Sequence, residues 1–287
     1  MAKQPIKKSQ QGKANDNSSV KQTIRKPSVK PSPQNSSTIF NTLEKHFESK
    51  RTAYIIAVII LAALFSFFCF DNKISIANDD ALYIEAGANY AKNFFGYFYT
   101  ATAPLYPILL SVLIKIIGVK LFILKTFSIL FFCLALYFIY KAFKNRIPYI
   151  ILIPTLLLVA LNNQFLMYAS LTYTETFSLM LFGVAFILLN KTIDSMEQPD
   201  YDLKKHIGTF VQIGFVCFVL MLARNVALAT IVLVVLFFIY RRKYIASSII
   251  AISFIVFYYT YKIALKYLWH LDDSQFSSQG DKMFNKD

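Results

Sequence analysis

Several long apolar runs constrain this chain more than any other feature of its sequence. Seven segments reach or approach the roughly 20 apolar residues that an α-helix needs to cross a bilayer. Charged residues make up only 16% of the chain, whereas an average soluble domain has about 25%. The sequence therefore predicts an all-α fold, a polytopic transmembrane helical bundle of about seven spans. The predicted spans are residues 53–70, 121–140, 148–165, 174–190, 207–223, 225–240 and 244–264.

The positive charge of the chain is distributed unevenly. Its formal net charge is +14, and residues 1–51 alone hold eleven Lys or Arg against three acidic residues. Such a polar segment has too little apolar surface to offset its ordering entropy, so we predict a disordered basic cytoplasmic tail over 1–51. Because this tail leads straight into a span, we expect it to contact membrane lipids and to control topology, rather than to bind nucleic acid.

Residues 104–118 are an eighth apolar segment, but this segment is short, carries two prolines near its start and contains Lys115. If it does not cross the membrane, three basic connections share one side with the basic N-terminus. If it crosses, all three move to the opposite side, against the positive-inside rule. We therefore expect a half-inserted or interfacial helix here. The connections hold Lys141, Lys144 and Arg146, then Lys191, Lys204 and Lys205, then Arg241, Arg242 and Lys243.

This topology predicts a multi-pass protein of a bacterial-type inner or plasma membrane, with a cytoplasmic N-terminus. Residues 52–264 are the transmembrane module, and residues 265–287 are a tail on the outer face. The first outer loop, 71–120, is too long for a simple connection and contains the interfacial helices. Long loops are often functional, so we expect the active face outside.

The pair Asp79–Asp80 opens a predicted helix in that outer loop, within the run NDDALYIEAGANYAKN. Asn78 can act as the N-cap, and carboxylates in a first turn interact favourably with the helix dipole, so capping alone would explain the pair. Helical spacing, however, places Asp79, Tyr83 and Tyr90 on one face, with small residues between them, on a surface over the membrane. Adjacent carboxylates near a low-dielectric boundary also raise each other's proton affinity. The pattern favours chemistry over capping.

Other charges at the span boundaries have competing interpretations. Lys125, near the outer end of a span, is expected to snorkel to the headgroups. Glu175 and Arg224 either belong to a functional site or pair with each other as a structural salt link.

Motifs for phosphate-loop or zinc chemistry are missing from the sequence. There is no Gly-rich phosphate loop, no HExxH and no CxxC, which leaves ATP hydrolysis and zinc-finger chemistry without a motif. Cys69, Cys133 and Cys217 lie far apart in apolar runs, so neither a disulfide framework nor a metal site is predicted. No cofactor is implied, and a divalent-metal requirement stays open.

Four motifs follow one another between residues 53 and 264. The acidic pair with Tyr83 follows the first span, and a proline–tyrosine entry (Pro104, Tyr106) leads into a short helix that ends at Gly118. Segment 168–175 places an acidic residue before the fourth span, and segment 220–224 contains a Leu-x-Arg turn. This order resembles the GT-C membrane glycosyltransferases. It is most similar to the branch that uses polyprenyl-phosphate sugars, the protein O-mannosyltransferases and the lipid A aminoarabinose transferase.

The resemblance implies an inverting transfer of a sugar from a polyprenyl-phosphate donor to a glycan, lipid or protein acceptor on the outer face. Asp79 matches the general base, and Asp80 matches its neighbour, which orients the acceptor or holds Asp79 in place. Arg224 would face the leaving lipid phosphate. The other substrate-binding positions that the resemblance implies are Tyr83, Tyr106 and Glu175.

Relatives of this kind carry more spans, so the resemblance leaves alternatives open. The chain is either a truncated product or is completed by a second subunit that supplies the missing spans. A non-catalytic or partner-dependent membrane scaffold is the first alternative function, which the short length supports. A transporter or flippase is the second, but such proteins usually show repeated halves and helices broken in mid-membrane. No repeat is evident, and Pro154 is the one proline well inside a span.

Overall fold

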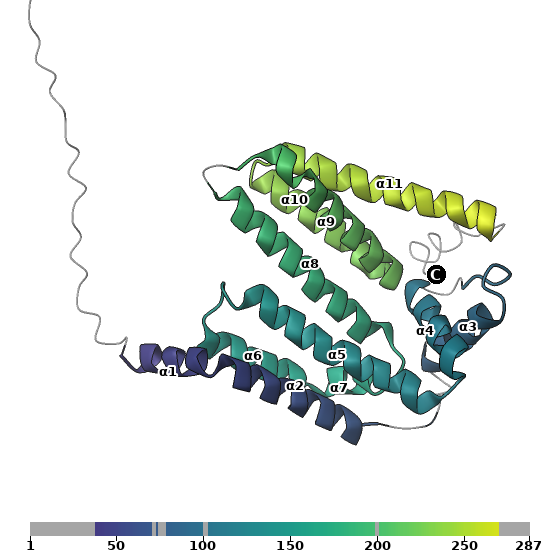
Figure 1. The fold of residues 1–287 in the computed structure, drawn as a ribbon, viewed down its shortest axis with the longest axis horizontal. Coiled ribbons are helices and arrows are strands. Elements are labelled where there is room, and N and C mark those ends of the chain that lie inside the picture. Colours follow the sequence, from purple (N-terminus) through teal and green to yellow (C-terminus); the bar gives the residue numbers. More distant parts are fainter. Residues whose placement is uncertain (1–37, 71–72, 74–78, 100–102, 199–200, 270–287) are drawn as a thin grey trace, which may run out of the picture. The chain divides into compact units, whose positions relative to one another are not determined.

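The computed structural model describes residues 38–70, 73, 79–99, 103–198 and 201–269. These residues form eleven α-helices and one short 3-10 helix, with no strand among them (Figure 1). The predicted all-α class is confirmed. The helices are α1 (Thr38–Ser49), α2 (Arg51–Phe68), α3 (Asp79–Lys92), α4 (Leu105–Ile117), α5 (Leu121–Phe143), α6 (Tyr149–Ala160), α7 (Asn163–Ala169), α8 (Thr174–Met196), α9 (Leu203–Ala223), η1 (Asn225–Ala227), α10 (Leu228–Tyr240) and α11 (Tyr244–Leu268).

Five of the described helices are long and apolar enough to cross a membrane, namely α2, α5, α8, α9 and α11. Helices α6 and α7 are bent by 59° at the break between them and together make a sixth candidate span. The segment predicted as a span over 225–240 is helical and apolar, but Asn225–Tyr240, which comprises η1 and α10, is shorter than the five full-length candidates. The chain is therefore a multi-pass helical bundle, with five or six full-length candidates.

The helices pack around three main apolar cores. Helix α2 shares the first core with α5, α6 and α7. The second core lies between helices α3 and α4 and the beginnings of α5 and α8. The third core lies among α9, α10 and α11. Helix α8 joins these groups, because it packs against α5 on one side and against α9 on the other (Figure 1).

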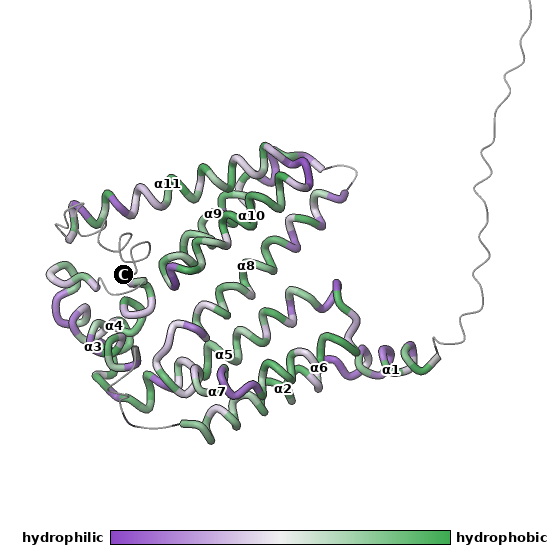
Figure 2. The backbone as a smooth tube through the Cα atoms, turned by 180° about the vertical axis from the view of Figure 1, so that it is seen from behind, coloured by the Kyte–Doolittle hydropathy of each residue, from purple (hydrophilic) through white to green (hydrophobic). Residues whose placement is uncertain are grey.

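Two ion pairs hold the three basic connections together at one end of the bundle. Arg146, between α5 and α6, pairs with Asp194 near the end of α8. Arg241, which follows α10, places Nη2 2.7 Å from Oε1 of Glu197, the residue after α8. Hydrophilic residues gather at these turns, whereas the helices between the two ends are mainly hydrophobic (Figure 2). The basic connections thus lie together, as the charge count predicted. We call this the basic end; it comprises residues 141–146, 191–198, 201–205 and 241–243.

Helix α1 replaces part of the tail that was predicted to be disordered. The two carboxylate oxygens of Glu44 accept hydrogen bonds of 2.8 Å from the backbone N–H groups of Tyr149 and Ile150. These groups begin α6 and have no partner within their own helix. For residues 38–51 the prediction of disorder was wrong, because α1 and α2 run through this segment and this contact helps to compensate the ordering entropy. Residues 1–37 lie outside the described residues.

Helices α3 and α4 lie at the other end of the bundle. Helix α4 has 13 residues, fewer than the roughly 20 that a span needs, and it packs along α3. Trp269, after α11, donates through Nε1 to the backbone oxygens of Phe94 (2.9 Å) and Tyr97 (3.0 Å). The loop between α3 and α4 is thereby joined to the end of the last helix.

The tyrosine face of α3 packs inside the protein instead of lying over the membrane as predicted. Tyr83 and Tyr90 are only 4% and 1% exposed. A Cβ atom added to Gly87 would lie 3.0 Å from Cβ of Leu110 on α4. The prediction of an open surface was wrong because the small residues between the tyrosines allow α4 to approach closely.

We expect Gly87→Leu to destabilise the protein, because the larger side chain would force α3 away from α4. Overpacking of this kind lowers the free energy of unfolding by about 1–3 kcal/mol. Gly208→Leu is the matched control, since a Cβ atom at this helical glycine meets nothing within 4 Å. Thermal unfolding in detergent should show a lower midpoint for Gly87→Leu alone. Equal midpoints for the two variants would contradict the close packing of α3 on α4.

Candidate functional site

The carboxylate of Asp80 lies at the centre of a buried polar cluster. Its Oδ2 lies 3.3 Å from Nζ of Lys125 on α5, and both side chains have no exposed surface. Its Oδ1 accepts a hydrogen bond of 2.9 Å from the backbone N–H of Thr172 and a second from the Thr172 hydroxyl. One carboxylate thereby connects the first turn of α3 and the N-terminal part of α5 with the segment before α8. We call these three residues the Asp80 cluster.

Lys125 is held inside the protein by two oxygen acceptors. Besides Asp80, its Nζ donates to the backbone oxygen of Lys73 at 2.5 Å. The prediction that Lys125 snorkels to the lipid headgroups was therefore wrong. A buried ammonium requires a charge partner and further hydrogen bonds, and Asp80 with Lys73 provides both. The sequence signal was a lysine within an apolar helix, but nothing in the sequence paired it with a residue on another helix.

Two tyrosines of the predicted site pack beside the Asp80 cluster. The rings of Tyr83 and Tyr106 meet edge to face, with their centroids 5.6 Å apart. Tyr106 has no exposed surface, and its hydroxyl lies 2.9 Å from Oγ of Ser128 on α5. Burial raises the pKa of Tyr106, and the negative charges of Asp80 and Glu175 add to the rise. The phenol therefore keeps its proton at neutral pH, and its hydroxyl is engaged within the protein.

Glu175 and Arg224 form the ion pair that was one of the two sequence interpretations. Nη1 of Arg224 lies 3.1 Å from Oε1 of Glu175, and the side chains are 40% and 20% exposed. Glu175 is in the first turn of α8, and Arg224 directly follows α9. An ion pair with this exposure contributes little to stability. The guanidinium also has N–H donors besides the one that faces Glu175, so it can bind an anion as well.

The fold brings most of the predicted site residues together. Asp80, Tyr83 and Tyr106 belong to one packed group, and a ring contact of 5.9 Å between Tyr106 and Phe177 on α8 connects this group to the turn that carries Glu175. Asp79 is the first residue of α3. Its side chain, like Asn78, lies outside the described residues. Sequence reasoning missed the acceptors and donors that complete the site, namely Thr172 and Ser128, and it misjudged Lys125.

No metal site emerges from this arrangement. Within the described ranges, no three or more His, Cys, Asp or Glu side chains are grouped so that they could hold a metal ion. Comparison of the chain with protein families, with curated proteins and with solved structures finds no match. The case for a function thus depends on the residues of the site themselves.

We expect Lys125→Met to destabilise the protein strongly, because Asp80 would remain buried without its cation. Breaking a buried ion pair in this way costs about 3–5 kcal/mol. The double variant Asp80→Asn/Lys125→Met should recover most of that loss, since no charge is left uncompensated. Unfolding in mixed detergent gives the free energy of unfolding of the unmodified protein, of Lys125→Met and of the double variant.

Arg146→Met is the control for this experiment, because it breaks an ion pair whose partners are 32% and 67% exposed. Such an exposed pair contributes about 0–1 kcal/mol. A loss in Lys125→Met no larger than in the control would mean that the Asp80 cluster does not stabilise the fold.

Proposed function

We propose that this protein is an inverting membrane glycosyltransferase that takes a sugar from a polyprenyl-phosphate donor. The observation that carries the proposal is the Asp80 cluster, which fixes the first turn of α3 and with it the backbone of Asp79. A fully buried ion pair is a poor source of net stability, because desolvation of both charges opposes it. Its formation by Asp80, one member of the acidic pair, is better explained by a need to hold the start of α3 in one place.

In the proposed reaction, Asp79 is the general base. Its carboxylate takes the proton of the acceptor hydroxyl while the acceptor oxygen forms a bond to the anomeric carbon. The bond between that carbon and the phosphate oxygen breaks at the same time, and the polyprenyl phosphate leaves with the electron pair. Attack from the side opposite the leaving group inverts the configuration of the sugar.

Asp80 and Arg224 have different parts in this proposal. Asp80 is a positioning residue, because its buried carboxylate is engaged by Lys125 and Thr172 and has no surface for an acceptor. Arg224 is partly exposed and would stabilise the negative charge that grows on the leaving phosphate. Its pairing with Glu175 keeps the guanidinium oriented at this end of the bundle.

A non-catalytic or partner-dependent membrane scaffold is the alternative function. The burial of Asp80, Tyr83 and Tyr106 favours it, because these side chains meet one another and the neighbouring helices rather than an open site. In that case the Asp80 cluster would serve the packing of the bundle alone, or a second subunit would complete the site.

The test is transfer by the full chain, reconstituted with labelled polyprenyl-phosphate sugars and membrane extract as the source of acceptors. We expect Asp79→Asn to lower the transfer rate by about 100-fold or more, the usual range for loss of a general base. Glu85→Gln is the matched control, since Glu85 lies on an exposed position of the same helix. Transfer that is unchanged in Asp79→Asn would exclude Asp79 as the base. Absence of transfer from the unmodified chain with every donor would favour the scaffold.

We further propose that the basic end faces the cytoplasm and that α3 and α4 lie on the outer side, at a bacterial-type plasma membrane. The grouping of the basic connections at one end supports this orientation through the positive-inside rule. The test uses a chain whose three cysteines are replaced by alanine. A cysteine at Lys92, exposed in α3, should react with an impermeant thiol reagent added to intact cells, whereas a cysteine at Asn145 should react only after lysis. Labelling of Asn145→Cys in intact cells would mean that the protein has the opposite orientation.

A further inference from the structure

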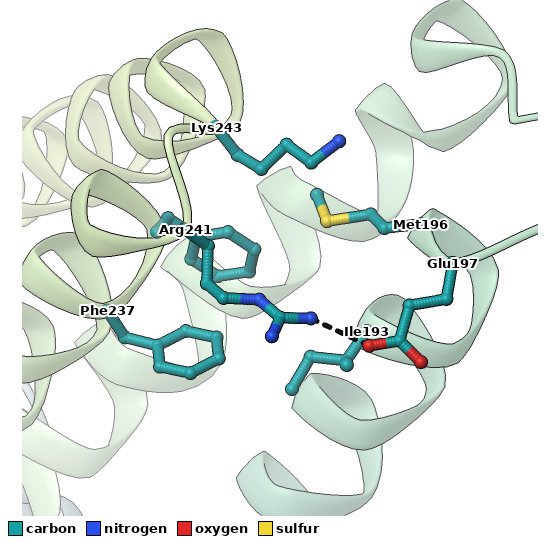
Figure 3. A pocket seen from close by; sticks show the side chains of 7 residues that line it. Ile193, Met196, Glu197, Phe237, Arg241 and Lys243 are labelled. Atoms are coloured by element: carbon teal, nitrogen blue, oxygen red, sulfur yellow. Dashed lines mark hydrogen bonds and ion pairs between the residues drawn. The ribbon is translucent and has the colours of Figure 1, made fainter. Parts of the chain in front are cut away.

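A cavity of about 400 Å³ lies at the basic end, where α8 and α10 finish (Figure 3). One part of its wall is apolar and the other is charged. The residues that line it are Ile193, Met196, Phe237 and Phe238, with Glu197, Arg241 and Lys243. This cavity is separate from the Asp80 cluster, whose Thr172 precedes the opposite end of α8 and whose other residues lie on α3 and α5.

The charged part of the wall has a net charge of +1, from two cations and one carboxylate. Glu197 accepts from Arg241 at 2.7 Å, which orients the guanidinium across the cavity (Figure 3). Nζ of Lys243 lies 5.6 Å from the centroid of the Tyr201 ring. The Tyr201 hydroxyl is buried and has no hydrogen-bond partner among the described residues. The site therefore combines two cations with an unused hydroxyl nearby, and its charge complements a ligand with one negative charge.

An apolar strip continues from the cavity along α10. Phe237 and Leu233 are four residues apart and share one face of this helix. Both are exposed, at 37% and 65% respectively. In a membrane this strip leads from the charged connections toward the bilayer interior, so the ligand that fits both parts has an anionic head and an apolar chain.

We propose that this cavity binds a single anionic phospholipid, with its phosphodiester against Arg241 and Lys243 and an acyl chain along Phe237 and Leu233. A phosphodiester carries one negative charge and matches the net charge of the wall. Basic segments at membrane boundaries attract anionic lipids, and each Lys or Arg near the surface adds to the attraction. The lipid would bridge α8 and α10 beside the Glu197–Arg241 ion pair. This site is independent of the glycosyltransferase proposal, because it uses none of the residues of that reaction.

The test measures binding of phosphatidylglycerol to the delipidated full chain by native mass spectrometry, with phosphatidylcholine as the zwitterionic comparison. The variant Arg241→Gln/Lys243→Gln removes both cations of the cavity. The control Arg146→Gln/Lys204→Gln removes the same charge from the same end, and likewise breaks one exposed ion pair, but neither residue lines the cavity. Thermal unfolding of both double variants checks that they fold alike.

We expect phosphatidylglycerol to bind the unmodified chain more tightly than phosphatidylcholine. Its affinity should fall by about tenfold or more in the cavity variant and by less than about twofold in the control. Lys243→Gln alone leaves the Glu197–Arg241 pair intact and should show an intermediate loss. An equal loss in both double variants would mean that the general surface charge of the basic end attracts the lipid, and it would overturn the site. Binding of glycerol phosphate as tight as that of phosphatidylglycerol would overturn the lipid as the occupant.

Discussion

The buried contact between Asp80 and Lys125 is the interaction on which this end of the bundle depends. Two opposite charges without exposed surface attract strongly in a low-dielectric interior, but each alone would be very unfavourable there. Each therefore requires the other, and the segments that carry them must stay together. Because Thr172 binds the same carboxylate, the position of α3 is set relative to both α5 and the start of α8.

The two ends of the bundle use charge in opposite ways. At the end with α3 and α4, the charges of the Asp80 cluster are buried and paired, and they fix geometry. At the basic end, the pairs Arg146–Asp194 and Arg241–Glu197 are partly exposed, where water weakens them, and the unpaired excess is positive. The first end is suited to hold residues in precise positions, and the second is suited to contact a charged surface.

Sequence patterns were most reliable where a property is local. Apolar runs identified the five long candidate spans, and the charge count grouped the three basic connections that the structure places at one end. The predictions failed where the outcome depends on which helix lies opposite. Lys125 was expected at the headgroups and α3 was expected to present its tyrosines over the membrane, yet Asp80 and α4 cover these side chains. The segment 38–49 is helical because it contacts α6, a partner that its own polar composition does not reveal.

The sequence by itself determined the class of this protein and the acidic pair at the start of α3, because hydropathy and helical spacing depend only on neighbouring residues. Only the tertiary structure decided that Lys125 is buried against Asp80, that Glu175 and Arg224 are paired, and that a cavity forms between α8 and α10. Each of these contacts joins residues from different helices, and the packing of the bundle, rather than any local preference, brings them within reach.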